Sequence, residues 1–422
     1  MQQARRKESA MAPKWLPRLS SIALLTTVLA LAATGVTPAL ASGSCLVKNR
    51  TSGVVFTRTT GDSLQSAIDA AFEGEVLAVR GRCVGSYVIE RALTIVGVET
   101  ARYPTATIDA NGGPTVITIN AGAAVSLRRL IVTGGEGTSL AGGIANTSGG
   151  DLILAHTWVT GNRSDGRGGG IYYVGDSLRL RSSRVSENRS RFSGGGGIYL
   201  EYGHVVLLGT SRVDHNSGNI GGGIFNGGTL DMYDSSIVNR NVSVNSGGGI
   251  FGGLVVLHDT ARISGNHAGK KSGHTSAGGG VAFATLVLED ASVIAWNRSY
   301  SQGGGVCVDT SSVEITDDAR IVHNHAPDGG GICSYGGSVT MSGRSTVASN
   351  TAKRNGGGIW FLEGALTMSE DATITLNTAR GGDPTAPNGI GGGVRTCDTV
   401  LTGVTEGVNV LANVPNDIEN CR

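Results

Sequence analysis

The chain lacks the features that mark several common classes of protein. Its six cysteines form no Cys-x-x-Cys pair, which argues against a zinc site. Beyond residue 41, no apolar run is long enough to form a membrane-spanning helix. The formal net charge is only +1 at pH 7, so no general basic character indicates a nucleic-acid partner. Long stretches with a 3.6-residue apolar period, which helical repeats need, are also missing.

Glycine, by contrast, is abundant, with 68 residues in a chain of 422. A chain this rich in glycine is expected to be disordered when apolar residues are scarce. Here apolar residues make up 39% of the sequence and recur at regular intervals. The excess glycine therefore indicates an architectural role.

Residues 1–41 are predicted to be a secretory signal that is absent from the mature protein. The apolar run SSIALLTTVLALAATGV follows five basic residues, and Ala39–Ala41 supplies small residues for cleavage before Ser42. A membrane anchor is the weaker alternative, because the run is short and no charge flanks its end. Loss of five basic residues and one acidic residue would change the net charge from +1 to −3. We expect a secreted, extracellular monomer with no nucleic-acid partner and no membrane span.

All six cysteines lie beyond the predicted cleavage site, and exported proteins are oxidised. We predict three disulfides between neighbours in the sequence: Cys45 with Cys83, Cys307 with Cys333, and Cys397 with Cys421. The second pair also follows from the repeat described below, because its members are one 26-residue period apart. Stacked turns would place them about 4.8 Å apart, which a disulfide accepts.

A repeat with two landmarks runs through most of the chain. Most intervals between successive glycine runs are 25 to 27 residues, and each run ends in an aliphatic residue: Ile144, Ile171, Ile198, Ile224, Ile250, Val281, Val306, Ile332, Ile359 and Val394. The second landmark is an asparagine three residues after an aliphatic residue: Asn162, Asn188, Asn216, Asn241, Asn266, Asn297, Asn324, Asn350 and Asn377. A period of this length indicates stacked supersecondary units.

The residues between these landmarks alternate between apolar and polar. In VEITDD and LTMSED the period is 2, as in a strand with one buried face. Three short strands and their turns fill about 26 positions, whereas a propeller blade needs about 40. We therefore predict an all-β fold, a right-handed parallel β-helix of roughly 12 turns.

The predicted β-helix forms a single domain over residues 42–422. Residues 42–135 are expected to form a cap and irregular opening turns, residues 136–394 the regular repeats, and residues 395–422 the closing end. In the opening part, Ser63–Phe72 has Leu64, Ile68 and Phe72 at helical spacing. We expect this helix to cover the open end of the first turn.

The two landmarks have different expected roles. Glycine fits a tight corner where backbones approach closely or φ is positive, and the aliphatic residue after it fills the interior. The asparagine is expected to turn inward at another corner and to hydrogen-bond to the asparagines of neighbouring turns. The glycine runs lack the strand-to-helix context of a dinucleotide-binding loop.

The sequence resembles two groups of β-helix proteins. Residues 62–135 look like the opening region of the pectate-lyase-like superfamily of right-handed parallel β-helices. The repeats resemble those of the polymorphic outer-membrane protein family, which pair Gly-Gly-Ala-Ile with Phe-x-x-Asn; this chain has Gly for Ala, and Val or Ile for Phe. We expect no counterpart of that family's carboxy-terminal barrel in these residues. The resemblance implies the fold, which hosts lyases, hydrolases, epimerases and adhesins alike.

Enzymes that this chain resembles use an Arg or Lys base beside a calcium-binding set of acids, or paired aspartates in strongly patterned motifs. Neither motif is found here. Glu289-Asp290, Asp317-Asp318 and Glu370-Asp371 are acidic pairs, which a general acid with a partner carboxylate needs. All three occupy the same repeat position, as turn chemistry predicts. No cofactor is expected, apart from calcium if the protein is a lyase.

An aromatic stripe is predicted from the residue after each corner aliphatic, which should point outward. On four consecutive turns this residue is Tyr172, Tyr199, Phe225 and Phe251. The stripe could stack on sugars or dock a partner, or it could steady the turns through ring contacts. The sequence leaves both interpretations open.

A basic stripe is predicted on the outer face of the third strand of each turn. Its members are Arg184, Arg212, Arg262 and Arg320, with Arg163, Arg189 and Arg298 just past the asparagine. It could hold an acidic polysaccharide, or it could be a solvated ladder balanced by nearby aspartates. Two lengthened corners, His267–Ala277 and Ala379–Ile390, lie on one side and are either binding loops or tolerated insertions.

These observations favour an extracellular binding or scaffolding module, directed at a polysaccharide or another cell-surface component. The alternative is a polysaccharide lyase or glycoside hydrolase working on the outer face. An aromatic strip without a cluster of acids and bases would favour binding, and such a cluster beside the lengthened corners would favour an enzyme.

Overall fold

The computed structural model describes residues 45–58, 62–99, 106–269, 276–381 and 391–420, which all belong to one compact unit, Ala41–Arg422. Three predictions fall wholly or partly outside these residues. They are the signal segment 1–41, the pairing of Cys397 with Cys421, and most of the two lengthened corners.

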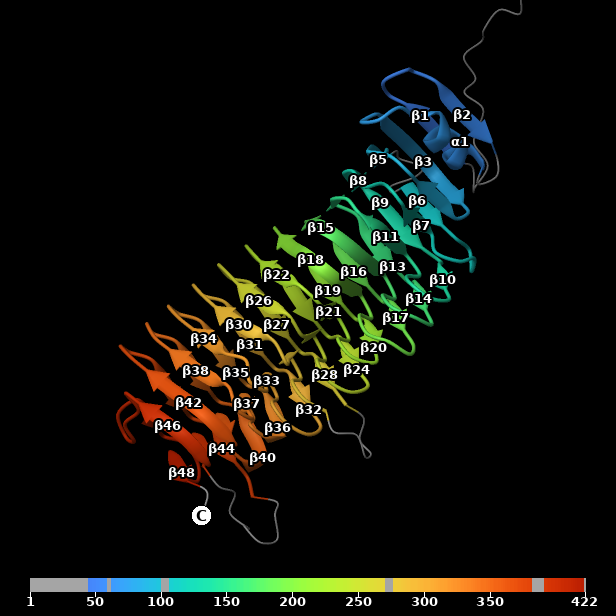
Figure 1. Ribbon diagram of the computed structural model, residues 1–422. Coiled ribbons are helices and arrows are strands. Elements are labelled where there is room, and N and C mark those ends of the chain that lie inside the picture. The colour runs from blue at the N-terminus through green and yellow to red at the C-terminus, as the bar shows by residue number, and fades with distance from the viewer. Residues whose placement is uncertain (1–44, 59–61, 100–105, 270–275, 382–390, 421–422) are drawn as a thin grey trace, which may run out of the picture. The chain divides into compact units, whose positions relative to one another are not determined.

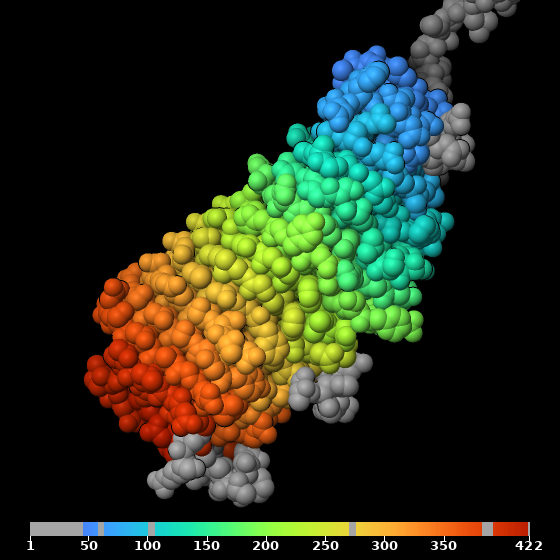
Figure 2. Space-filling model, viewed as in Figure 1, coloured from blue at the N-terminus to red at the C-terminus, as the bar shows by residue number. Residues whose placement is uncertain are grey.

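The chain forms an all-β parallel solenoid of about 12 turns, which confirms the predicted fold class (Figure 1). Its right-handedness stays a prediction. A typical turn has four strands, β21 (Ile224–Asn226), β22 (Thr229–Met232), β23 (Ile237–Asn239) and β24 (Val242–Ser243). Each pairs in parallel with its equivalent one turn later. The colour in Figure 2 therefore changes in ordered bands along the stacked turns.

The first two stacks of strands follow the glycine runs. The first stack contains β4 (Tyr87–Ile89), β7 (Ile117–Ile119), β11 (Ile144–Gly149), β15 (Ile171–Arg181), β18 (Ile198–Leu208), β21, β25 (Ile250–Phe251), β29 (Val281–Ala282), β33 (Val306–Val308), β37 (Ile332–Ser334), β41 (Ile359–Phe361), β45 (Val394–Thr396) and β48 (Ile418–Asn420). The second stack contains β5 (Leu93–Gly97), β8 (Val125–Arg128), β12 (Leu152–Ala155), the later parts of β15 and β18, β22, β26 (Leu254–Leu257), β30 (Thr285–Leu288), β34 (Val313–Ile315), β38 (Ser338–Met341), β42 (Glu363–Met368) and β46 (Asp398–Thr402).

The other two stacks lie on either side of the asparagine corner. The third stack contains β6 (Ala106–Asp109), β9 (Leu130–Thr133), β13 (Trp158–Thr160), β16 (Arg184–Ser186), β19 (Arg212–Asp214), β23, β27 (Arg262–Ser264), β31 (Val293–Ala295), β35 (Arg320–Val322), β39 (Thr346–Ala348), β43 (Thr373–Thr375) and β47 (Val410–Leu411). The fourth stack contains β10 (Glu136–Gly137), β14 (Arg163–Ser164), β17 (Arg189–Ser190), β20 (Ser217–Gly218), β24, β28 (His267–Ala268), β32 (Arg298–Ser299), β36 (His325–Asp328), β40 (Thr351–Asn355) and β44 (Thr378–Ala379).

The amino-terminal end of the solenoid is capped by different elements. Strands β1 (Cys45–Asn49), β2 (Val55–Arg58) and β3 (Val76–Val84) pair antiparallel through β1. Helix α1 (Asp62–Ala70) buries Leu64 and Ile68 in the main core. The prediction that Phe72 shares this helical face is wrong, because the helix ends before it and the Phe72 side chain is 77% exposed.

Three consecutive glycines at each corner meet three different requirements, which the turn at Gly221–Gly223 illustrates. Gly221 has a φ of 60°, in the left-handed region that favours glycine. A Cβ atom on Gly222 would collide with the carbonyl oxygen of Gly248 on the next turn. A Cβ atom on Gly223 would lie 2.8 Å from Nδ2 of Asn241. The glycines are therefore scaffold, and the aliphatic residue that follows them lies buried in the core.

The nine repeat asparagines lie inside the solenoid and form a continuous ladder. At Asn241, the backbone N–H and the side-chain Nδ2 both donate to Oδ1 of Asn266, each at 3.0 Å. The same Nδ2 donates to the carbonyl oxygen of Val213 at 2.8 Å. Asn413 continues the ladder past Asn377. A ladder amide such as that of Asn241 thus satisfies backbone groups of the preceding turn and donates to the asparagine side chain of the next turn.

A second corner, after each second-stack strand, also has left-handed backbone. We call its left-handed residues the turn ridge: Arg129, His156, Ser182, Gly209, Asp234, Asp259, Asp290, Asp317, Gly343 and Glu370. Over four consecutive turns the ridge residue is an aspartate. The backbone N–H of Asp259 donates to Oδ2 of Asp290 at 2.8 Å, and Asp234 donates to Asp259 in the same way.

Two of the predicted disulfides are present. Cys45 and Cys83 are bonded with their Cα atoms 4.6 Å apart. Cys307 and Cys333 are bonded across adjacent turns with a Cα separation of 4.5 Å, and they are register partners in β33 and β37. In the part of the chain that the structure describes, no helix has the length and apolarity to cross a membrane.

Candidate functional site

The predicted aromatic stripe forms a packed ladder outside the main core. Tyr172 and Tyr199 are only 7% and 8% exposed and form a separate apolar cluster with Ala141 and Ala145. The rings of Tyr199 and Phe225 are stacked at 4.4 Å with an interplanar angle of 6°, and Phe225 and Phe251 follow at 5.6 Å and 17°. Neighbouring rings therefore occupy the faces on which a sugar would stack.

The outer edge of this ladder is also covered. The Arg167 guanidinium lies 5.3 Å from the centre of the Tyr199 ring and forms an ion pair with Glu201. The Tyr172 hydroxyl is 3.4 Å from the same carboxylate. Burial, followed by the Glu201 charge, raises the pKa of both tyrosines. This geometry favours the interpretation in which the stripe steadies the turns.

The predicted basic stripe is interrupted along the third stack. Arg184 and Arg212 are register partners on adjacent turns, but Ile237 separates Arg212 from Arg262. Val293 in turn separates Arg262 from Arg320. Only the first two arginines therefore lie side by side, and the later two stand alone on the outer face.

Arg184 and Arg212 line a hollow of about 290 Å³ together with Trp158 and the hydroxyl-bearing Ser182, Ser183 and Thr210. We call it the strand hollow. Trp158 is 48% exposed and is the register partner of Arg184. Arg184 donates two 2.9 Å hydrogen bonds, from Nε and Nη2, to the carboxylate of the buried Asp214. These hydrogen bonds raise the pKa of Arg184. The guanidinium is thus held in one orientation beside the indole.

A second hollow, of about 590 Å³, is lined by residues that come shortly before those of the strand hollow in the sequence of each turn. We call it the turn hollow. Its lining contains Arg128, Arg129, Arg181 and His156, on a partly apolar wall of Val96, Ile153 and Ala155. Its lining residues include no carboxylate. Arg128 donates through Nε to the Ser126 hydroxyl at 2.9 Å, and this is a neutral partner. Three arginines thus face one hollow without a balancing negative charge in its lining.

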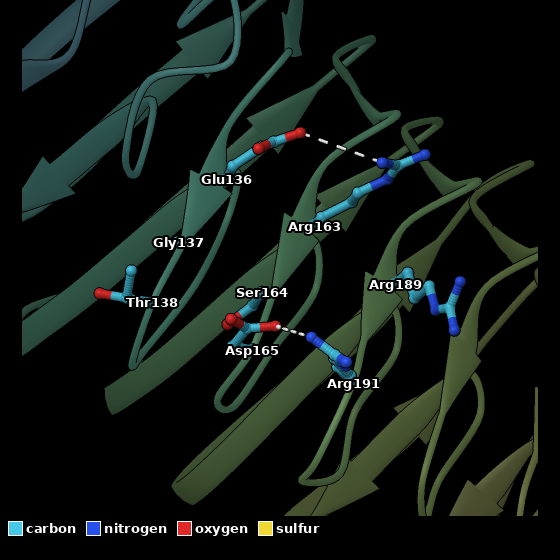
Figure 3. Close-up of a pocket in the computed structure, with 8 residues that line it drawn as sticks. All are labelled: Glu136, Gly137, Thr138, Arg163, Ser164, Asp165, Arg189 and Arg191. Atoms are coloured by element: carbon cyan, nitrogen blue, oxygen red, sulfur yellow. Dashed lines mark ion pairs between the residues drawn. The ribbon is translucent and has the colours of Figure 1, made fainter.

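A third hollow, of about 530 Å³, lies on the fourth stack of the same turns (Figure 3); we call it the corner hollow. It is lined by Arg163, Arg189 and Arg191 together with Glu136 and Asp165. Arg163 is 4.0 Å from Glu136, and Arg191 is 3.7 Å from Asp165. All four of these side chains are more than half exposed. Such surface ion pairs contribute about 0–1 kcal/mol, so an anionic ligand could exchange for the carboxylates.

The three hollows together form what we call the basic wall. Three, two and three arginines line the turn, strand and corner hollows, against two carboxylates in all. The turn hollow lies along β8, β12 and β15, the strand hollow along β13, β16 and β19, and the corner hollow along β10, β14 and β17. The wall therefore covers neighbouring turns near the amino-terminal end, and it includes Arg163, Arg184, Arg189 and Arg212 of the predicted stripe.

The acidic pairs have structural partners. Asp290 and Asp317 belong to the turn ridge, where each carboxylate accepts a backbone N–H from the preceding turn. Glu370 accepts the N–H of Gly343 at 2.6 Å. Among the described residues, no three His, Cys, Asp or Glu side chains are grouped so that they could hold a metal ion. This arrangement matches the turn chemistry expected from the recurrence of the pairs.

Several residues of the basic wall were not identified from the sequence. Trp158 precedes Arg184 in its register column, and Arg129 occupies the ridge position where later turns have acids, with Arg128 and Arg181 beside the ridge. Aligning these positions by turn would have revealed the change of sign. Arg298, the remaining residue predicted past the asparagine, lies over the Tyr300 ring at 5.0 Å, far along the chain from the wall.

Comparison with known proteins yields no match to a family model, and no significant match among curated proteins or solved structures.

Proposed function

We propose that this protein is an extracellular binding module that holds an acidic polysaccharide on the basic wall. The observation that carries the proposal is the turn hollow, where Arg128, Arg129 and Arg181 line one concave surface with no carboxylate. Bringing like charges together is unfavourable, and a bound anion would relieve that repulsion. Two disulfides and the predicted signal are compatible with a location outside the cell.

A glycan fits the wall better than other polyanions. The strand hollow combines the exposed Trp158 ring with an oriented guanidinium and three hydroxyl-bearing side chains. A sugar ring presents an apolar face to an indole and hydroxyl groups to polar side chains, and a uronate carboxylate suits a fixed arginine. Further along the solenoid, the turn ridge is acidic, so the polymer is expected to stay on the amino-terminal turns.

The proposal is tested by binding of alginate, a polyuronate, with neutral dextran and a DNA duplex as comparison ligands. Replacing both Arg129 and Arg181 with Ser should weaken alginate binding about tenfold, or ~1.4 kcal/mol. The matched control replaces Arg262 and Arg320, which are exposed arginines outside the wall, and should leave binding unchanged. Raising the salt concentration should weaken the wild-type interaction, because the wall is exposed.

Three results would contradict this function. Equal effects of the two double variants would mean that binding depends on total charge alone. Tighter binding of the DNA duplex than of alginate would favour a nucleic-acid partner. Release of unsaturated or shortened sugars from alginate would favour the lyase or hydrolase alternative.

A further inference from the structure

The aromatic ladder has a gap on three consecutive turns. After Phe251, the equivalent register positions hold Ala282, Cys307 and Cys333, and an aromatic residue returns only at Trp360. Two aromatic side chains from other positions, Phe283 and Tyr335, pack against the disulfide at this gap. A hollow of about 470 Å³ lies between them, lined also by Ser246, Gln302 and Asp309. It is on later turns than the basic wall.

Phe283 occupies a position that is glycine on the preceding turn and has a left-handed backbone on both turns. Its φ is 53°, a conformation that bulky residues rarely adopt. On the preceding turn the equivalent residue is Gly252, with a φ of 80°. The equivalence is fixed by the backbone, since Gly252 donates to the Ala282 carbonyl and Phe283 to the Cys307 carbonyl, at 2.9 and 2.8 Å. A phenyl ring is thus held beside the hollow at a conformational cost.

Two polar side chains in the hollow have unused hydrogen-bonding capacity. The Tyr335 hydroxyl donates to Oε1 of Gln302, which leaves the Gln302 amide NH2 without a partner among the described residues. The Asp309 carboxylate is exposed and makes no hydrogen bond or ion pair within the same part of the chain. Burial, together with the Asp328 and Asp309 charges, raises the pKa of Tyr335, so its hydroxyl remains a donor at neutral pH.

These groups match the chemistry of an uncharged sugar ring. The apolar C–H face of a pyranose packs on aromatic rings such as Phe283 and Tyr335. Its hydroxyl groups can donate to the Asp309 carboxylate and accept from the Gln302 amide. The same carboxylate repels a uronic acid, so the site selects against the ligand of the basic wall. We infer that this hollow, walled by Phe283 and Tyr335, is a binding site for a neutral hexopyranose.

The experiment uses the full chain and three neutral probes: the methyl pyranosides of glucose, galactose and mannose. Saturation-transfer NMR and titration should show saturable binding of at least one probe, with a Kd of about 1 mM. Phe283→Gly should weaken that binding about tenfold, or ~1.4 kcal/mol. The variant should still fold, because glycine suits the positive φ and already occupies this position on the preceding turn. Asp309→Asn should also weaken binding.

The matched control is Trp296→Ala, which removes an exposed aromatic side chain from another corner and should leave the affinity unchanged. Absence of saturable binding for all three probes would overturn the inference. So would an unchanged affinity in Phe283→Gly. The site does not depend on alginate binding, so failure of one proposal is distinguishable from failure of the other.

Discussion

The turn ridge keeps one backbone conformation along the solenoid but has opposite charges in its two halves. On the amino-terminal turns it contains Arg129 and His156, with Arg128 and Arg181 beside them. Beyond the neutral Gly209, four consecutive turns place an aspartate at the same position: Asp234, Asp259, Asp290 and Asp317. A change of residue type on an unchanged scaffold thus separates the two regions.

The two halves use their side chains differently. An aspartate is short enough for its carboxylate to reach the N–H of the preceding turn, and Asp234, Asp259 and Asp290 each donate to the next aspartate in this way. An arginine is longer and has no acceptor for that N–H, so its guanidinium extends into the turn hollow. The comparison shows that side-chain length at one position decides whether the residue stabilises the fold or is available to a ligand.

The largest expected effect tests whether the scaffold is the same in both halves. Asn188→Ala on the basic turns and Asn350→Ala on the later turns should each lower the free energy of unfolding by about 1–3 kcal/mol. Both asparagines are buried, and each donates twice to the next asparagine of the ladder. Chemical denaturation of the two variants measures this.

The control for the ladder is Asn219→Ala, at a half-buried asparagine outside it whose hydrogen bonds with Phe192 and Asn245 are partly open to solvent, so it should cost only about 0.5 kcal/mol. If Asn188→Ala were as mild as this control while Asn350→Ala were costly, the two halves would not share one scaffold.

A smaller effect on stability distinguishes the ridge aspartates, which stabilise the fold, from the ridge arginine, which is available to a ligand. Asp259→Gly removes the acceptor for the Asp234 N–H and should lower stability by about 0.5–1.5 kcal/mol. Asp259→Asn keeps an acceptor and tolerates the left-handed backbone, so its cost should stay below about 0.5 kcal/mol. Arg129→Gly loses no such hydrogen bond and should leave the melting temperature unchanged or raise it. A costly Arg129→Gly together with a harmless Asp259→Gly would reverse our assignment.

The smallest expected effect is a pH dependence of stability, which arises from two histidines outside the basic wall. Burial, followed by the Arg298 charge, lowers the pKa values of His267 and His325 in the folded protein. Below the ordinary histidine pKa of about 6.5, the unfolded chain therefore binds more protons, and stability falls as the pH drops through that range. The loss should be about half a kcal/mol or less per histidine, because solvent screens these half-buried groups.

Melting curves at several pH values between neutral and mildly acidic measure this slope. The double variant His267→Gln with His325→Gln should flatten it. An unchanged slope in that variant would place the acid-sensitive groups elsewhere.

The repeat period allowed much of the fold to be predicted. Because strands in successive turns stack in register, a residue's place in the period determines its neighbours, which is why Cys307 and Cys333 could be paired in advance. The period does not determine how a side chain leans or what covers it. The residues Tyr172, Tyr199, Phe225 and Phe251 could therefore be aligned in advance, but the choice between a sugar-stacking strip and rings that steady the turns depends on ring packing that the period does not give.

The candidate sites depend on residues that depart from the repeat. These departures are visible in the sequence, but the sequence does not show that a hollow forms beside them. Phe283 stands where the preceding turn has a glycine. The change from Ile-Phe-Gly-Gly to Val-Ala-Phe-Ala therefore marks the hollow between Phe283 and Tyr335. Trp158 likewise stands in the column that later holds arginines. Hollows form where neighbouring turns differ in side-chain size, and a consensus of the repeat averages such differences away.

The buried asparagine ladder also restricts how the chain can be synthesised. Four of its members, Asn162, Asn188, Asn241 and Asn297, are followed two residues later by serine, which makes them acceptors for N-linked glycosylation. Their side chains are fully enclosed, with residue exposures of 0 or 1%. An oligosaccharide attached to the nascent chain would have no space in the interior and would block stacking at that turn. The fold is therefore compatible only with synthesis that leaves these asparagines unmodified.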